Sequence, residues 1–179
     1  MMKRYLFPLV VLCIGISSCG MFQSIIKSSF PYTTTLGIPS SSKEGAEYSA
    51  ISMANSFDQN FSKKGNNGDR ISQVRVISAK LRTDEPSDYN IGNIATVKIY
   101  LSKEDGTNEI LVASRNDIGA NVGNEVVLDI DNTQLLDVLV REPNIRVRMA
   151  YKLRKKISSD ASLHVTLGLA AYPADKASN

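Results

Sequence analysis

The chain has 179 residues, 42% of them hydrophobic, with 21 basic and 18 acidic side chains and a formal charge of +3. This length is enough for one domain with a sizeable hydrophobic core and too short for two domains that each have one. Residues 1–18 hold two of the basic side chains and none of the acidic ones, so the chain from Cys19 onward has a charge of only +1. The basic balance is therefore no argument for a nucleic-acid partner, and we expect none.

The first element along the chain is a secretory signal. Lys3 and Arg4 precede an apolar run from Tyr5 to Ile16, which is too short to span a bilayer. We therefore interpret residues 1–18 as a signal peptide that is cut off before Cys19. Cys13 leaves with this peptide and Cys19 is the one cysteine that remains, so we expect no disulfide.

The four residues at the cut, Ile16, Ser17, Ser18 and Cys19, resemble the lipobox of bacterial lipoproteins. The resemblance implies that Cys19 becomes the acylated first residue of the mature protein, with palmitate-type chains as its anchor. Two or three such chains make membrane attachment effectively permanent. Residues 19–30 show no clear period and suit a lipid-anchored tether.

Residues 31–175 form the predicted folded domain. The stretch Pro31–Leu36, rich in threonine and tyrosine, predicts its first strand. Residues 50–61 are ambiguous between helix and strand. Apolar residues there recur at helical spacing, which favours a helix: Ala50, Met53, Ala54, Phe57 and Phe61.

From Gln73 onward the hydrophobic pattern has period two, which predicts half-buried strands. These strands cover Gln73–Leu81, Ile94–Leu101, Glu109–Ala113 and Val126–Ile130. The Asp105-Gly106 step predicts a tight hairpin between the second and third of them. After the fourth, Asp131 or Asn132 could cap a short helix that buries Leu135, Leu136 and Leu139.

The last third of the chain alternates most clearly. Apolar residues occupy one parity over 145–153 and again over 163–169, which predicts a long antiparallel hairpin with one face in the core. Together these segments predict an all-β fold, an antiparallel β-sandwich of about seven or eight strands with one or two short helices.

Several of these segments resemble a group of small exported lipoproteins of Bacteroidetes. The matching stretches are Ile71–Val76, Ile94–Ser102, Ile110–Ala113, the capped leucine segment and the final hairpin. The resemblance implies an immunoglobulin-like or jelly-roll sandwich and an outer-membrane location, and it carries no catalytic residue. The residues after Cys19 lack the acidic cluster that resembles a surface-export signal in that phylum, which favours the periplasmic face.

Residues suited to catalysis or to metal binding are few. The one histidine, His164, has the non-core parity of a strand, and we interpret it as an ordinary strand residue. Three acidic groups could serve carboxylate chemistry, but turns or a helix cap explain them: Asp84, Glu85 and Asp88; Glu104 and Asp105; Asp129 and Asp131. The loop Gly119–Asn124 lacks the lysine and helix of a phosphate loop. We therefore expect no catalytic residue, no cofactor and no metal.

Four basic residues, Arg146, Arg148, Lys152 and Arg154, share the polar parity of one strand. Their side chains would line one surface and favour an anionic partner. The alternative is a solvated face neutralised by acidic neighbours. Basic residues also protect an edge strand against aggregation.

The sequence thus predicts a lipid-anchored cell-envelope protein that serves as a non-catalytic binding or structural module. Its partner beyond the membrane would be an envelope protein, an anionic lipid or a glycan. Two alternatives stay open: a carboxylate-dependent hydrolase of envelope glycans, and a subunit of a larger surface assembly. Two converging carboxylates would favour the first, and an unpaired long edge strand or an exposed apolar patch the second.

Overall fold

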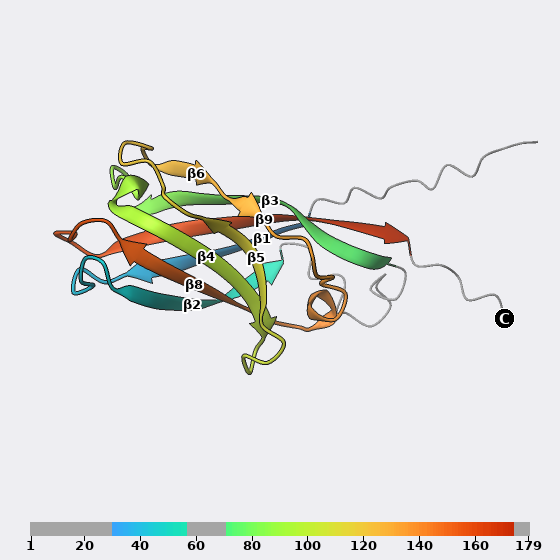
Figure 1. The fold of residues 1–179 in the computed structure, drawn as a ribbon. Coiled ribbons are helices and arrows are strands. Elements are labelled where there is room, and N and C mark those ends of the chain that lie inside the picture. Colours follow the sequence, from blue (N-terminus) through green and yellow to red (C-terminus); the bar gives the residue numbers. More distant parts are fainter. Residues whose placement is uncertain (1–29, 57–70, 174–179) are drawn as a thin grey trace, which may run out of the picture.

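The computed structural model describes residues 30–56 and 71–173, which form a β-sandwich of two antiparallel sheets (Figure 1). The predicted fold class is confirmed, since strands make up 58% of the structure and no helix reaches seven residues. The strands are β1 (Phe30–Ile38), β2 (Glu47–Ser56), β3 (Ile71–Glu85), β4 (Ile94–Lys103), β5 (Ile110–Arg115), β6 (Glu125–Val127), β7 (Asp129–Ile130), β8 (Ile145–Leu153) and β9 (Ala161–Pro173). Two single 3₁₀ turns, η4 (Ile91–Asn93) and η5 (Leu139–Arg141), complete the described elements.

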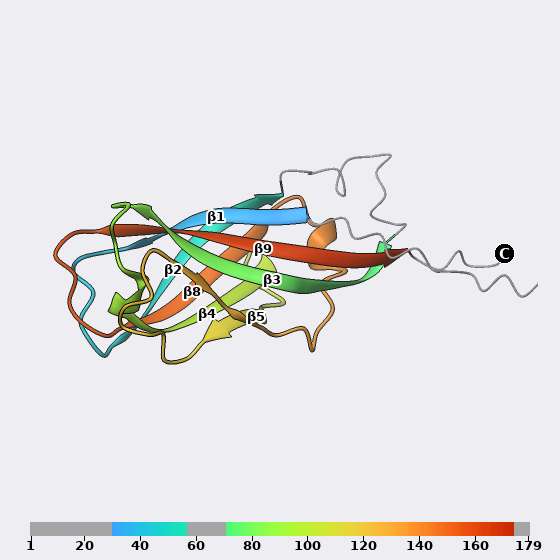
Figure 2. The same ribbon diagram turned by 90° about the horizontal axis from the view of Figure 1, so that it is seen from above.

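The four strands of sheet A run in the order β6-β3-β9-β1, and the five of sheet B in the order β2-β8-β4-β5-β7. The two sheets join where β1 pairs with β2 over two residue pairs, Tyr32 with Ser56 and Thr33 with Asn55. Seen from above, β1 and β2 cross as they pass from one sheet to the other (Figure 2). Among the described residues, no helix is long and apolar enough to cross a membrane.

The core lies between the sheets and follows the predicted parity. The inward residues of β8 are at most 2% exposed: Ile145, Val147, Met149, Tyr151 and Leu153. Those of β9 are at most 1% exposed: Leu163, Val165, Leu167 and Leu169. Alternate positions on a strand face opposite sides of the sheet, so each strand contributes one buried row and one outer row.

The predicted hairpin of β8 with β9 is wrong. Strand β8 pairs with β2 and β4 in sheet B, whereas β9 pairs with β1 and β3 in sheet A. The connection between them crosses the end of the sandwich, and Ile157 at its middle is 5% exposed. Both strands face the same core from opposite sides, which produces the same alternation that a hairpin would.

The predicted helix over 50–61 is also wrong as far as the structure describes it. Residues 50–56 belong to β2, and residues 57–61 lie outside the described ranges. Strand β2 pairs with β8 over eight consecutive residue pairs, from Glu47 with Lys152 to Ala54 with Ile145. Its inward positions are Tyr48, Ala50, Ser52 and Ala54, so small and polar inward residues concealed the period of two.

Two further corrections concern the segment after β5. The predicted strand Val126–Ile130 is divided, because β6 pairs with β3 in sheet A while β7 pairs with β5 in sheet B. The short helix predicted after it is absent from the described chain, which has only the turn η5 there. Leu136 and Leu139 are buried as expected, but Leu135 is 44% exposed.

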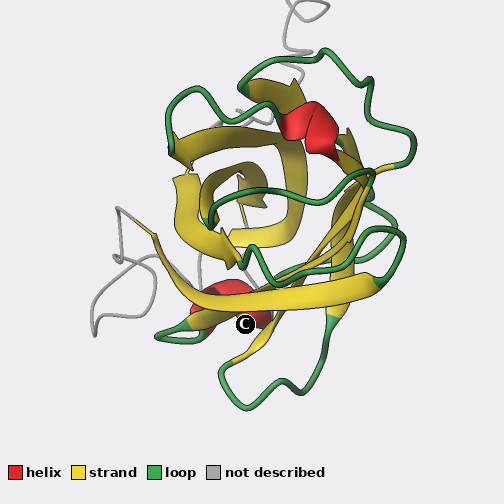
Figure 3. Ribbon diagram, turned by 90° about the vertical axis from the view of Figure 1, so that its left-hand side faces the viewer, coloured by secondary structure: helices red, strands yellow, loops and turns green. Residues whose placement is uncertain are grey.

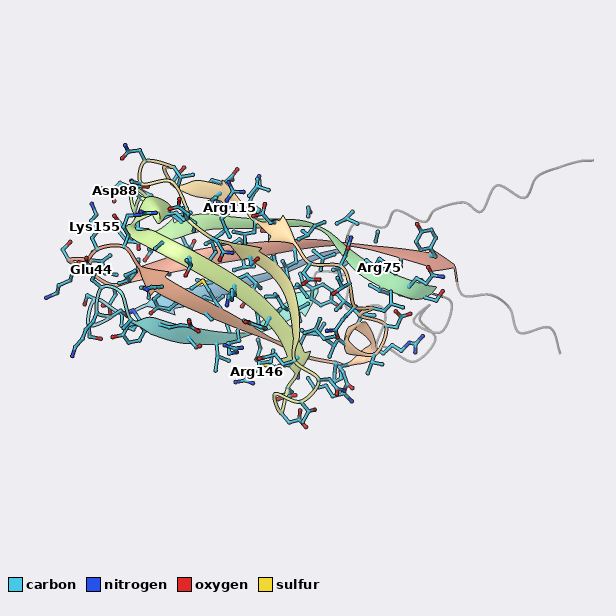
Figure 4. The ribbon with its side chains drawn as sticks, in the orientation of Figure 1. Glu44, Arg75, Asp88, Arg115, Arg146 and Lys155 are labelled. Atoms are coloured by element: carbon cyan, nitrogen blue, oxygen red, sulfur yellow. The ribbon has the colours of Figure 1, made fainter. Side chains whose placement is uncertain are left out.

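The two ends of the sandwich differ. The connections 39–46, 86–93, 116–124 and 154–160 gather at one end, which we call the loop end; Glu44, Asp88 and Lys155 mark it in Figure 4. Figure 3 looks onto this end and shows the loops lying across it. At the opposite end β1 begins, β3 begins and β9 ends, and we call it the tether end.

Candidate functional site

The outer face of sheet B holds three of the four predicted basic residues. Arg146, Arg148 and Lys152 all point away from the core on β8, as their parity predicts. Their neighbours on the outer faces of β2 and β4 complete a surface that we call the basic face: Glu47, Ser49, Ile51, Met53, Lys98 and Tyr100.

Arg148 is held firmly at the centre of the basic face. Its Nε and Nη2 donate to the two carboxylate oxygens of Glu109, at 2.7 and 2.6 Å, and its Nη1 donates to Ser49 Oγ at 3.3 Å. The guanidinium carbon lies 4.1 Å from the centroid of the Tyr100 ring, a cation–π contact. Hydrogen bonds from Arg148 hold the pKa of Glu109 below its usual value. The charge of Arg148 is thus compensated in place.

Arg154 has a different role from the other three. It follows the end of β8, and its side chain donates to the Gly92 carbonyl at 3.2 Å, to Asp117 Oδ1 at 3.2 Å and to the Ile118 carbonyl. Its own backbone N–H donates to the Asn93 carbonyl. Arg154 therefore joins two connections of the loop end, and its geometry is that of a structural residue.

Arg146 and Lys152 are paired less closely than Arg148, although the charge of Arg146 also helps to lower the pKa of Glu109. Neither forms an ion pair with any carboxylate in the described ranges, although Glu47 is the cross-strand neighbour of Lys152. Exposed Lys98 on β4 adds a third cation beside them. Figure 4 shows Arg146 beside the β4–β5 turn, near the tether end of this face.

The same face carries two exposed apolar residues that a helix over 50–61 did not predict. Ile51 is 52% exposed and Met53 37% exposed on β2, next to Arg148 and Arg146 respectively. Read as a strand, Glu47, Ser49, Ile51 and Met53 share one parity, so this signal was present but was obscured by the helical interpretation. The basic face thus combines cations with exposed apolar side chains.

The three acidic groups lie apart from one another. Asp84 and Glu85 line an open depression of about 560 Å³ at the loop end, together with Pro86, Ser87, Ser159 and Asp160. A hydrogen bond from the Ser40 backbone N–H lowers the pKa of Asp160. A general acid needs the opposite shift.

The other acidic side chains act in turns or in an ion pair. Asp105 accepts hydrogen bonds from Thr107, and Asp131 from Thr133, and these bonds lower the pKa of each carboxyl. Asp129 pairs with Arg115 at 3.1 Å. Within the described ranges, no group of three histidine, cysteine, aspartate or glutamate side chains could hold a metal ion.

The loop Gly119–Asn124 packs on η4. Asn90 donates to the Ala120 carbonyl and accepts from the Gly123 N–H, while Ile91 N–H donates to the Gly123 carbonyl. A Cβ atom at Gly92 would lie 2.2 Å from the Ala120 oxygen, so only glycine permits this approach.

His164 lies on β9 with Nδ1 3.4 Å from Thr35 Oγ1. Neither feature forms a site with the acidic groups.

A groove of about 330 Å³ lies at the tether end of sheet B. Its walls are the start of β5 and the β7–β8 connection, and its lining combines apolar with polar residues: Ile110, Leu135, Val138 and Leu139, with Asn108, Glu109 and Gln134. The sequence predicted three of these leucine and isoleucine residues as buried or part of a strand, but not the groove. Cys19, the predicted acylation site, lies outside the described residues.

Comparisons with known proteins give distant likenesses only. No family model matches the sequence, and no curated protein matches it. One solved structure similar in part is an arabinose-bound MgGH51 α-L-arabinofuranosidase, with a TM-score of 0.35 and 10% identity, covering 78% of this chain and 19% of that one. Another is CpGH89CBM32-5 from Clostridium perfringens in complex with GalNAc-β-1,3-galactose, with a TM-score of 0.34 and 12% identity, covering 79% of this chain and 94% of that one.

Proposed function

We propose that this chain is a cell-envelope lipoprotein of the kind found in Bacteroidetes, anchored by acyl chains on Cys19. Its β-sandwich acts as a non-catalytic binding module. The anchor rests on the signal-like residues 1–18 and the lipobox-like residues 16–19. The absence of an acidic cluster after Cys19 favours the periplasmic face of the outer membrane.

The observation that carries the binding role is the basic face. Arg146, Lys152 and Lys98 have no ion-pair partner in the described chain, and Ile51 and Met53 expose apolar surface on β2, beside the cations of β8. The cations would attract a partner that presents phosphate or carboxylate groups, such as an anionic lipid headgroup or an acidic glycan of the envelope. The exposed apolar side chains beside them would lose their water on contact with that partner and add to the binding.

A charge-reversal experiment tests the binding role. The variant Arg146→Glu, Lys152→Glu should fold normally, because exposed substitutions usually change stability by less than about 0.5 kcal/mol. It should lose salt-dependent binding to anionic liposomes. The matched control is Lys155→Glu, Lys156→Glu, which makes the same change of charge at the loop end. Equal binding by both variants and the parent chain, or no preference for anionic over neutral liposomes, would contradict the role of this face.

The anchor has its own test. The intact mass of the mature protein should correspond to a chain that starts at Cys19 and carries acyl groups, and Cys19→Ala should release the protein from the membrane fraction. An alanine variant that stays in the membrane fraction would contradict acylation as the anchor.

One observation favours the second candidate function, a subunit of a surface assembly. Residues 47–52 of β2 pair with β8 on one side only, because β1 meets β2 only at Asn55 and Ser56, and Thr34 Oγ1 donates to the Met53 carbonyl. This edge has no proline, lysine or bulge to block another strand. Under this function Ile51→Lys should abolish self-association measured by analytical ultracentrifugation, and a chain that is monomeric before the substitution would contradict it.

The glycan hydrolase has less support. Asp105, Asp131 and Asp160 all have lowered pKa values and act in turns or backbone contacts. The depression that Asp84, Glu85 and Asp160 line is open to solvent, whereas a cleft that raises the pKa of a general acid is enclosed.

A further inference from the structure

Three separate elements carry exposed apolar side chains toward the tether end. Leu135 and Val138 of the β7–β8 connection are 44% and 55% exposed, and Met53 near the end of β2 and Tyr172 near the end of β9 are each 37% exposed. The position of Leu135 and Val138 at this end follows from their neighbours, since Leu136 N–H donates to the Val74 carbonyl and Asp137 accepts from Gln73 and Val74 at the start of β3.

The connection that carries Leu135 and Val138 is fixed to the domain. Its two anchors, Leu136 and Leu139, are 1% exposed in the core. Because backbone bonds to β3 hold one side and buried leucines hold the other, the two exposed side chains project from a rigid base. Such an arrangement costs little ordering entropy when an apolar surface covers it.

The acidic side chains beside them are already engaged. Asp131 accepts from Thr133, Asp137 accepts two backbone N–H groups of β3, and Glu142 pairs with Lys103 at 2.8 Å. Arg75, at the same end, donates to the Asn132 carbonyl and has no carboxylate partner in the described ranges (Figure 4). Contact with phosphate headgroups would therefore place no unengaged carboxylate of this connection against negative charge.

The length of the tether limits how far the tether end can lie from a bilayer that holds Cys19. Phe30 begins β1 at this end, eleven residues after Cys19. A chain spans at most about 3.3–3.6 Å per residue, so a bilayer that holds Cys19 is within about 40 Å of this end of the sandwich.

We propose that the tether end is a membrane-docking surface, in which Leu135 and Val138 enter the interface of the bilayer that holds the anchor. This inference rests on the proposed lipid anchor. It adds that the sandwich stands on its tether end, with the loop end turned away from the lipid surface. Interfacial apolar side chains with a flanking cation are what such a contact requires.

The test places a fluorescent label at either end of a membrane-attached chain. The mature chain is made with Cys19→Ser and an N-terminal oligohistidine that binds phosphatidylcholine vesicles through a nickel-chelating lipid. The vesicles also contain a lipid with a nitroxide on its acyl chain. One variant carries Val138→Cys and the matched control carries Val122→Cys, an exposed valine of the loop end. Each is labelled with a thiol-reactive environment-sensitive dye.

We expect nitroxide quenching at position 138 to exceed that at position 122 several-fold, with a blue-shifted emission at position 138 only. Adding Leu135→Ser to the Val138→Cys chain should reduce that quenching. Equal quenching at both positions would overturn the proposal. Failure of the dye to react with Cys at position 138 before vesicles are added would also overturn it, because the side chain would then be covered by protein. Because the oligohistidine imposes attachment, this result is independent of whether Cys19 is acylated in cells, which the mass and fractionation measurements decide.

Discussion

At the scale of single residues, the contribution of a buried polar side chain to the stability of this domain depends on whether it has a hydrogen-bond partner. Two tyrosines near the loop end show this. The hydroxyl of Tyr151 lies 3.0 Å from Ser42 Oγ, with both residues 2% exposed. The hydroxyl of Tyr89 is buried without a hydrogen bond of normal geometry in the described chain, and burial raises the pKa of Tyr89 to about 12.

These two tyrosines should respond oppositely to loss of the hydroxyl. Tyr151→Phe leaves the buried Ser42 hydroxyl without its hydrogen-bond partner and should lower the free energy of unfolding by about 1–3 kcal/mol. Tyr89→Phe removes an unsatisfied group and should leave the free energy unchanged or raise it by up to about 1 kcal/mol. Urea unfolding of both variants measures the difference. A Tyr89→Phe variant as unstable as Tyr151→Phe would show that Tyr89 has a partner.

The Arg148–Glu109 pair predicts a dependence of stability on pH. Arg148 lowers the pKa of Glu109 in the folded protein below the ordinary value for a glutamate, 4.5. Its contribution is therefore fully present above about pH 4.5 and is lost as the pH falls through the folded pKa. Because both side chains are partly exposed, the contribution should be about 1 kcal/mol or less.

The variant Glu109→Gln measures that contribution. It should unfold more easily than the parent chain at pH 7, and the difference between the two should vanish below the folded pKa, where Glu109 is protonated in both states. A difference that persists unchanged at pH 3 would mean that Glu109 acts through packing and not through its charge.

At the scale of elements, period two predicted strands well but not their partners. All the strands expected at Pro31–Leu36, Gln73–Leu81, Ile94–Leu101 and Glu109–Ala113 are present, and the turn at Gly106 has the positive φ, 85°, that the Asp-Gly step predicts. The pairing of β8 and the division of Val126–Ile130 were not predictable. Alternation reports which face is buried, and both sheets bury the same core.

A buried leucine stands where the chain passes from β6 in sheet A to β7 in sheet B. Leu128 lies between β6 and β7, is 3% exposed, and its N–H donates to the Ala79 carbonyl. Leu128→Ala should lower the free energy of unfolding by about 2–5 kcal/mol, the range for a buried leucine. Its neighbour Val127 is 62% exposed and provides the control, because Val127→Ala should change stability by no more than about 0.5 kcal/mol. Similar losses in both variants, measured by chemical denaturation, would contradict this account of the crossing.

At the scale of the whole molecule, the two sheets share one core and are joined through β1 and β2, so they should unfold together. The mature chain with Cys19→Ser should give a β-type circular dichroism spectrum and one thermal transition. Neither reductant nor chelator should move its midpoint, because the chain after Cys19 has no cysteine. Two separate transitions, or a midpoint that falls with chelator, would overturn this expectation.

By itself, the sequence determined the all-β class, the parity of β3, β4, β8 and β9, and the outward direction of Arg146, Arg148 and Lys152. These properties are local, because burial of one face imposes a period of two on the strand that carries it. Only the tertiary structure decided which strands pair, that residues 50–56 are a strand, and which cations of the described chain form no ion pair. Those properties depend on distant partners: Glu109 is 39 residues from Arg148, and Asp117 is 37 from Arg154. No periodicity within a single segment records which residue of another segment will lie beside it.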